Sequence, residues 1–128
     1  MHYVVDTHAI IWFLQGTSLT ARARDALRNH ESSLVVPTIV LAEIKYLKAK
    51  GRIGPSLNEA MATIGADPRF TIYPFDESVV TLMPTSLDIH DAIIVGTALV
   101  YRDLLGVRVR VVTRDAKIIA SALVETVW

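Results

Sequence analysis

The chain has 128 residues, of which 52% are hydrophobic, and its 13 basic residues balance its 13 acidic ones. This length fits a single domain over residues 1–128, with enough apolar side chains to build a core without disulfides or a structural metal. The zero net charge weighs against a generic binder of phosphate backbones, and the absence of cysteine excludes disulfides and thiolate metal ligands.

Short apolar runs alternate with longer amphipathic segments along the whole chain. The runs have the length and character of buried strands, and the longer segments carry apolar residues on one helical face. Pro37 stops one run and suits the first turn of the next helix, Asp76 is a candidate N-cap, and Gly106 ends the longest helical segment. In chain order, the pattern predicts a strand over 3–5, helices over 7–14 and 19–30, a strand over 33–36, helices over 37–51 and 55–64, a strand over 70–75, helices over 76–83 and 89–105, a strand over 109–113, a helix over 116–122 and a strand over 124–127.

This alternation predicts an α/β fold in which helices cover both faces of a parallel sheet of about five strands. Ligands of such sheets bind beyond the carboxyl ends of the strands, near the point where the strand order reverses. Asp6 follows the first predicted strand and Asp115 follows the fourth. If these two strands are neighbours, both carboxylates face one crevice, but one sequence leaves the strand order open.

The start of the chain lacks the basic segment of a signal peptide, and Asp6 interrupts its apolar stretch. Strongly apolar runs such as residues 92–101 are well short of the ~18 residues that a membrane span needs. We therefore expect a cytoplasmic protein with no membrane segment.

Four acidic residues follow a strand-like run or lie in the first turns of a helix: Asp6, Glu43, Asp91 and Asp115. Carboxylates that share one edge of a sheet repel one another unless a cation lies between them, so the pattern predicts a divalent-metal site. Without cysteine the ligands must be oxygen or imidazole, which favours Mg²⁺ or Mn²⁺ over structural zinc. Such a site indicates metal-dependent hydrolysis of a phosphodiester, with RNA as the expected substrate.

Each acid also has an ordinary structural alternative. Asp6 and Asp115 could cap the helices that follow them. Asp91 could do the same, although Asp88 competes for that position. Glu43 has no basic residue four positions further on, so the usual helix ion pair is missing. Four such residues on one predicted edge favour the metal site over four separate caps.

Four segments resemble the PIN-domain ribonucleases of the VapC toxin type: VVDTHAIIWFL, LAEIKYL, HDAIIVGTAL and VVTRDAKI, which together span essentially the whole chain. The resemblance implies a PIN-like three-layer α/β/α fold with a five-stranded parallel sheet. It also implies an endoribonuclease that depends on Mg²⁺ or Mn²⁺, with one or two ions, and that acts as the toxin of a toxin–antitoxin pair.

Carried over residue by residue, the acids named above resemble the catalytic quartet of the family. The resemblance implies that Asp6, Asp91 and Asp115 are metal ligands, and that Glu43 is either a ligand or the general base that orients water. Many relatives have an aromatic residue and a proline before the third acid, where this chain has isoleucine and histidine. With Asp88 close by, the register of that ligand stays open.

Three further residues are candidates for contacts with substrate. Thr7 and Thr113 resemble hydroxyl residues that the family places beside the first and last acids. Arg114 is adjacent to Asp115 and could hold a flanking phosphate, although a solvated position is the ordinary alternative. His8 has no recognisable ligand spacing.

The resemblance further implies a homodimer and a cognate VapB-type antitoxin whose amphipathic segment crosses the mouth of the site. Several apolar side chains exceed what a small sheet cover needs and could belong either to the core or to such interfaces: Trp12, Phe13, Ile39, Val40, Leu41, Tyr46 and Leu47.

Other functions of small α/β domains lack their motifs here. A receiver-type phosphoacceptor needs paired acids after the first strand, and a haloacid-dehalogenase-like phosphatase needs an Asp where His8 stands. A nucleotide-binding module needs a glycine-rich turn, which residues 6–9 lack. The alternative that stays open is a catalytically inactive PIN-like module that binds nucleic acid or serves as a scaffold.

Overall fold

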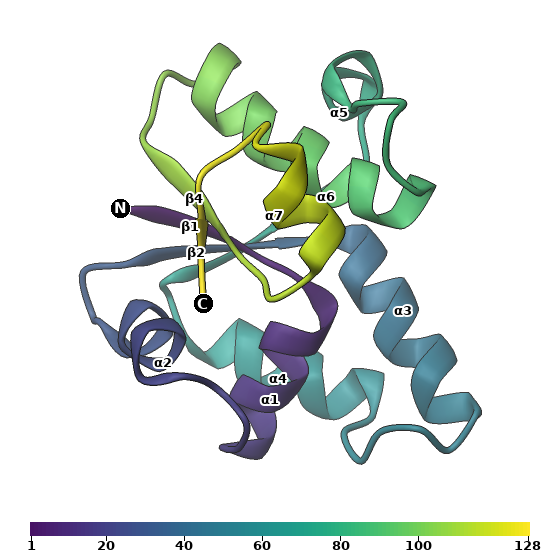
Figure 1. The fold of residues 1–128 in the computed structure, drawn as a ribbon. Coiled ribbons are helices and arrows are strands. Elements are labelled where there is room, and N and C mark those ends of the chain that lie inside the picture. The colour runs from purple at the N-terminus through teal and green to yellow at the C-terminus, as the bar shows by residue number, and fades with distance from the viewer.

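Five short strands form one parallel sheet in the computed structural model, which describes residues 1–128 (Figure 1). The order across the sheet reverses between the first and fourth strands, which are direct neighbours and which precede Asp6 and Asp115. The strands are His2–Val5 (β1), Ser33–Pro37 (β2), Phe70–Tyr73 (β3), Val109–Val112 (β4) and Thr126–Val127 (β5), in the spatial order β3-β2-β1-β4-β5 with every neighbouring pair parallel.

Seven α-helices surround the sheet. They are Thr7–Gln15 (α1), Ala21–Arg28 (α2), Thr38–Ala49 (α3), Leu57–Ala66 (α4), Glu77–Leu82 (α5), Ile89–Leu99 (α6) and Ala116–Ser121 (α7). In the view of Figure 1, α1, α2 and α4 lie below the sheet, α5 and α6 lie above it, and α3 stands beside the carboxyl ends of the strands. The structure therefore confirms the predicted α/β fold with helices on both faces of a five-stranded parallel sheet.

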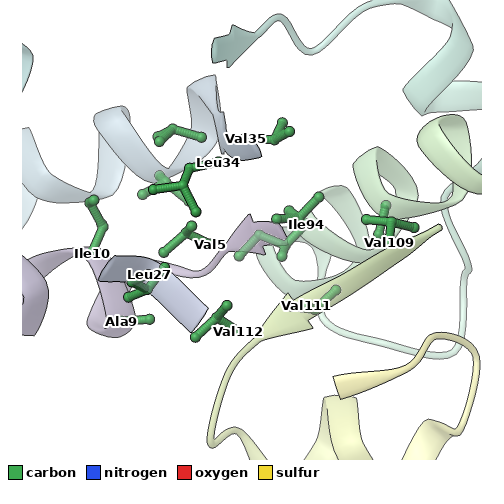
Figure 2. Close-up of a cluster of buried hydrophobic side chains, with 14 of the residues drawn as sticks. Val5, Ala9, Ile10, Leu27, Leu34, Val35, Ile94, Val109, Val111 and Val112 are labelled. Atoms are coloured by element: carbon green, nitrogen blue, oxygen red, sulfur yellow. The ribbon is translucent and has the colours of Figure 1, made fainter. Parts of the chain in front are cut away.

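The inner part of the sheet is buried on both faces because β1, β2 and β4 are largely apolar (Figure 2), whereas the edge strand β3 exposes Thr71 and Ile72. Ile94 of α6 packs against one face, whereas Ile10 of α1 and Leu27 of α2 belong to the same core cluster. Gly96 lets α6 approach the end of α5 closely, because an added Cβ would lie only 2.9 Å from the Cβ of Met83. This close packing seats the helix whose first turn carries Asp91.

The helix predicted over 89–105 is divided in the structure. The α-helix ends at Leu99, and the chain continues as a π-helical turn, Val100–Leu104 (η1), before Gly106 with a φ of +67°. The wider turn accompanies the burial of Tyr101, whose ring centroid lies 5.5 Å from that of Tyr73. The prediction of one continuous helix over 89–105 is therefore wrong.

Two strands are shorter than predicted. The strand predicted over 70–75 ends at Tyr73, because Pro74 has no N–H to donate and the Phe75 N–H donates instead to the Thr38 hydroxyl at 3.1 Å. The last strand, predicted over 124–127, is limited to the edge residues of β5.

Side-chain caps set several helix ends. The helix predicted over 19–30 begins at Ala21, since the Thr20 hydroxyl caps it. Asp76 caps α5 as predicted, by accepting a hydrogen bond from the Val79 N–H at 3.0 Å. None of the helices combines the length and the apolar character that crossing a membrane requires.

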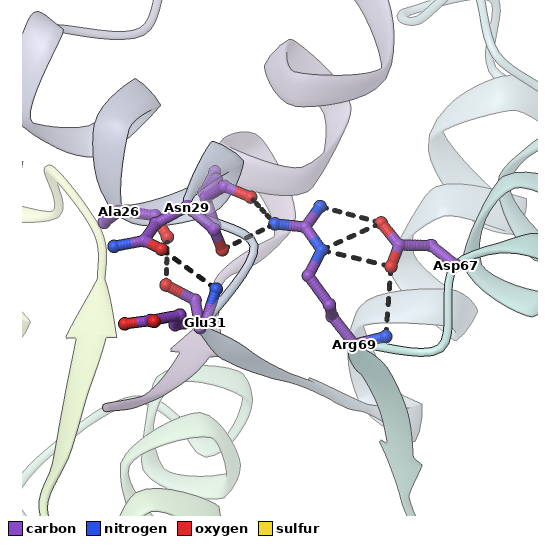
Figure 3. A network of polar contacts seen from close by, with 7 residues as sticks. Ala26, Asn29, Glu31, Asp67 and Arg69 are labelled. Carbon is purple, nitrogen blue, oxygen red and sulfur yellow. Dashed lines mark hydrogen bonds and ion pairs between the residues drawn. The ribbon is translucent and has the colours of Figure 1, made fainter.

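Arg69 joins three segments at the amino edge of the sheet (Figure 3). Its guanidinium forms an ion pair with Asp67 at 2.7 Å and donates to the carbonyls of Leu27 and Asn29 at 2.9 Å each. The guanidinium thereby satisfies carbonyls at the end of α2 and fixes that end to the start of β3.

Candidate metal and catalytic site

A polar cavity of about 310 Å³ opens at the carboxyl edge of the sheet. The four predicted acids all line it, although they come from four separate parts of the chain. Asp6 follows β1, Glu43 lies in α3, Asp91 lies in the first turn of α6, and Asp115 follows β4. The complete lining is Asp6, Thr7, His8, Glu43, Asp91, Ile94, Arg114 and Asp115.

Asp6 caps α1 and lines the cavity at the same time. Its Oδ1 accepts a hydrogen bond from the Ala9 N–H at 2.8 Å, while its own N–H donates to the Val112 carbonyl at 3.2 Å and ties it to β4. The side chain is buried, and this burial raises its pKa above the ordinary value. The charge of Asp115 raises the pKa further, whereas the Thr113 hydroxyl lowers it.

Asp115 has the same double position on the neighbouring strand. Its Oδ1 accepts hydrogen bonds from the N–H groups of Lys117 and Ile118 at 2.9 and 3.0 Å, so it caps α7. In Asp6 and in Asp115 only Oδ1 takes part in these caps. Capping therefore holds each carboxylate in place without using its second oxygen. The predicted caps are confirmed, and the caps leave an oxygen of each carboxylate for the metal site that stays a prediction.

Asp91 and Glu43 have no such backbone partners. Asp91 accepts no hydrogen bond from the protein, and Oε1 of Glu43 is buried without a partner, while Oε2 lies 3.9 Å from Nδ1 of His90. Burial is the largest cause of a raised pKa at Asp91, and neighbouring charges raise it further in the order Asp115, Asp88, Glu43 and Asp6. The carboxylates of the cavity are therefore close enough to repel one another.

The two threonines occupy different positions. Thr7 lines the cavity, and its buried Oγ1 has no hydrogen-bond partner. Thr113 is completely buried outside the lining, and its hydroxyl accepts a hydrogen bond from the Asp115 N–H at 3.0 Å. Thr113 is thus placed to position the acids rather than to reach a substrate.

Asp88 stands beside the cavity rather than in it. It occupies the N-cap position of α6 without a capping hydrogen bond from its side chain. Its exposed carboxylate lies 3.7 Å from Nζ of Lys117. Asp91 is therefore the acid of this segment that lines the cavity.

The residues fit a hydrated divalent cation. No group of three or more His, Asp or Glu side chains is arranged to hold a metal ion by itself. Mg²⁺, however, keeps several waters and takes one or two carboxylates directly. The unpartnered Oε1 of Glu43 and Oγ1 of Thr7 are polar atoms that such a water shell would satisfy. The donor set suits a partly hydrated ion and not a closed cage of side chains.

Comparison with known proteins shows which family the chain belongs to. The family profile of the PIN domain matches residues 3–125. The chain belongs to the PIN-domain family. This PIN domain is also similar to a chain of VapBC2 from Rickettsia felis bound to a DNA fragment from their promoter, with a TM-score of 0.66, 15% sequence identity, and coverage of 99% of this chain and 98% of that chain.

A second solved structure supports the same fold assignment. A chain of a toxin–antitoxin complex from Klebsiella pneumoniae gives a TM-score of 0.63 at 20% identity, with 94% of this chain and 92% of that chain covered. No curated protein matches the sequence. The resemblance to PIN domains is therefore confirmed over nearly the full length.

His8 of the cavity lining, and two aromatic residues that lie beside the lining without belonging to it, were not predicted as site residues from the sequence. His8 lines the cavity, and Trp12 lies one helical turn further along α1. The spacing of these two residues on one helix face was an available signal. The position of Trp128 had no signal in the sequence. Its ring centroid lies 5.5 Å from that of Trp12, and this approach depends on the pairing of β5 with β4.

Proposed function

We propose that this PIN domain is a metal-dependent endoribonuclease that hydrolyses RNA phosphodiester bonds as the toxin of a toxin–antitoxin pair. One observation supports it most. Four carboxylates from separate segments line a single cavity, and in that cavity one carboxylate oxygen and one hydroxyl are buried without partners. Such an arrangement is costly for stability alone and is typical of sites that bind charged groups.

Asp6, Asp91 and Asp115 would hold Mg²⁺ or Mn²⁺, as one ion or two. A bound divalent cation supplies charge neutralisation for the phosphate oxygens and activation of the attacking water. Glu43 either adds a ligand or accepts the proton of the attacking water as a general base. Thr7 would hydrogen-bond a phosphate oxygen or a water molecule, and Thr113 would keep Asp115 in place.

A cognate VapB-type antitoxin and a second copy of the chain are the proposed partners. A mainly apolar groove of about 540 Å³ lies along α3 and borders the acidic cavity, since Glu43 lines both. Its apolar lining consists of Ile39, Ala42, Tyr46 and Leu47. An amphipathic segment laid in this groove would reach the acids. Trp12, Phe13 and Leu41 pack against the core without lining the groove, whereas Ile39 and Leu47 do both.

The second candidate function is an inactive PIN-like module that binds nucleic acid without cutting it. The observation that favours it is the lack of three side chains arranged to hold an ion directly. Binding of RNA without cleavage, in both Mg²⁺ and Mn²⁺, would support this candidate.

Cleavage of labelled RNA under a Mg²⁺ titration tests the nuclease proposal. Asp6→Asn is a suitable inactive control, because asparagine also caps helices and the variant should fold normally. The wild-type protein should cut RNA only when the cation is present, and Asp6→Asn should not cut it. Equal cleavage by both proteins, or cleavage in EDTA, would contradict the proposal.

A further inference from the structure

Arg114 has an unusual environment for a basic residue beside four carboxylates. It is the only Lys or Arg that lines the acidic cavity, yet it forms no ion pair or hydrogen bond with any of these acids. Elsewhere in the fold, Arg69, Arg102 and Arg110 each pair with a carboxylate at 3.0 Å or less. The guanidinium of Arg114 instead lies over the Trp12 ring, with Cζ 4.5 Å from the ring centroid.

Trp12 is the centre of a group of neighbouring rings that pack at tilted angles, 48° to His8 and 58° to Trp128. Its centroid lies 5.5 Å from that of His8 and 5.5 Å from that of Trp128. Trp12 and Trp128 are half-buried and pack against the core, whereas His8 and Arg114 are exposed and both line the acidic cavity. The half-buried Trp12 thus contacts two exposed polar side chains that line the cavity, and Trp128 packs beside Trp12.

The positions of these residues follow from the same strand ends that place the acids. Asp6 caps α1, so His8 and Trp12 lie one turn apart on the same side of that helix. Arg114 stands between Thr113 and Asp115 after β4, and Trp128 follows the neighbouring strand β5. The backbone positions of the group are therefore set by the same strand ends as those of Asp6 and Asp115.

We propose that His8, Trp12 and Arg114 form a nucleotide subsite that binds one nucleotide of a single RNA strand beside the phosphate to be cut. This inference rests on the proposed nuclease function and extends it to how the substrate is held. An Arg guanidinium offers a planar fork of donors that suits a phosphate, and its free face can stack on a base. Proteins bind single-stranded RNA by stacking its bases on aromatic side chains and on guanidinium planes.

The charges in the cavity support this assignment over a purely structural role. A guanidinium held over an indole ring by a cation–π contact does not use its N–H donors in an ion pair, so they stay available to a phosphate. A chain with zero net charge has no general attraction for RNA, so a local cation at the acidic cavity is needed to hold the strand. Trp12 acts here as a positioning residue, and Arg114 and His8 are the groups that would touch the nucleotide.

Intrinsic fluorescence gives a direct test, because Trp12 and Trp128 are the only tryptophans and both belong to this group. The parent protein for the test is Asp91→Asn, in which RNA should not be consumed. A single-stranded oligoadenylate is titrated in Mg²⁺, and the fluorescence change is followed. Repeating the titration with Trp128→Phe added leaves Trp12 as the sole reporter.

We expect saturable quenching of the tryptophan fluorescence by the parent protein's binding of the strand. Arg114→Lys keeps the positive charge but removes the planar guanidinium group, so it should weaken binding about tenfold or more. An abasic strand of the same length should bind about tenfold more weakly than oligoadenylate. Arg22→Ala, at an exposed arginine of α2 that has no ion pair, is the matched control and should bind like the parent. Thermal unfolding of each variant checks that the fold is retained.

Three results would each overturn the subsite: equal affinity for Arg114→Lys and its parent, equal affinity for the abasic strand, or equal quenching by a poly-glutamate peptide. Cleavage by the wild-type protein is measured separately. If quenching behaves as expected but no RNA is cut, the subsite stands and the nuclease proposal fails. If RNA is cut and Arg114→Lys binds normally, the subsite fails and the nuclease proposal stands.

Discussion

The charged groups of Arg69 and Asp67 at the amino edge of the sheet are paired, whereas several of those at the carboxyl edge are not. At the amino edge, the Arg69 guanidinium is fully engaged by Asp67 and by two backbone carbonyls (Figure 3). At the carboxyl edge, burial and mutual repulsion raise the pKa of Asp6 and Asp91, and Oε1 of Glu43 is buried without a partner. The pairs at the first edge satisfy Arg69 and Asp67, whereas the second edge leaves polar groups without partners, which is typical of sites that bind charged groups.

The largest expected effect is on activity at the carboxyl edge. Asp91→Asn should lower RNA cleavage about a hundredfold or more, because it removes a proposed ligand of the cation. In EDTA the same variant should be as stable as the wild-type protein or more stable, since the substitution removes a repelled, partly buried charge. Cleavage assays and thermal unfolding in EDTA measure the two effects.

Asp88→Asn is the matched control for that prediction. Asp88 lies three residues earlier, is exposed, and stands outside the acidic cavity. The variant should cleave RNA like the wild-type protein. A large loss of stability in Asp91→Asn, or equal loss of cleavage in both variants, would show that the charge of Asp91 has no special role.

A smaller effect, on stability alone, is expected at the amino edge. Arg69→Met should lower the free energy of unfolding by about 2 kcal/mol, because Asp67 and two carbonyls lose their donor. Urea unfolding measures the change. Arg110→Met breaks the exposed pair with Glu125 and should have little effect on stability. If Arg69→Met were as stable as Arg110→Met, the interactions of Arg69 with Asp67 and with the two carbonyls would not stabilise the fold as we infer.

The smallest predicted effect is the pH dependence of the stability that the Arg69–Asp67 ion pair contributes. The Arg69 guanidinium holds the pKa of Asp67 below its ordinary value of 3.8, so the folded state takes up the proton less readily than the unfolded state. The pair therefore stabilises the fold at neutral pH and loses this contribution as the pH falls below that value.

Asp67→Asn should consequently be less stable than the wild-type protein by about 1 kcal/mol at neutral pH. The difference should shrink progressively as the pH is lowered below 3.8, since the folded-state carboxylate then begins to take up its proton. Urea unfolding over a series of pH values from neutral to acid measures it. A difference that stays constant with pH would mean that the carboxylate charge is not involved.

Much of the carboxyl edge was predictable from the sequence because strand ends and helix starts have local signals. Asp6 and Asp115 follow apolar runs, and both were predicted as caps or as metal-site residues. The structure adds that each residue caps with one oxygen only, which is a matter of side-chain geometry. The adjacency of β1 and β4, which brings the two acids together, depends on long-range pairing that one sequence does not specify.

The remaining features depend on contacts between distant segments or on backbone detail. Arg69 reaches carbonyls about 40 residues earlier in the chain, and Trp128 reaches Trp12 across two strand pairings. The π-helical turn after Leu99 leaves the apolar pattern unchanged, so periodicity does not reveal it. The shortened β3 depends on a hydroxyl of Thr38, which belongs to another element.

Calorimetric titration of Mn²⁺ into the wild-type protein, Asp91→Asn and Asp88→Asn tests most directly whether the separate carboxylates share a divalent cation. The wild-type protein and Asp88→Asn should bind Mn²⁺ saturably with equal affinity, and Asp91→Asn should bind it about tenfold more weakly or not at all. Absence of saturable binding to the wild-type protein, or equal binding by all three proteins, would contradict a shared cation.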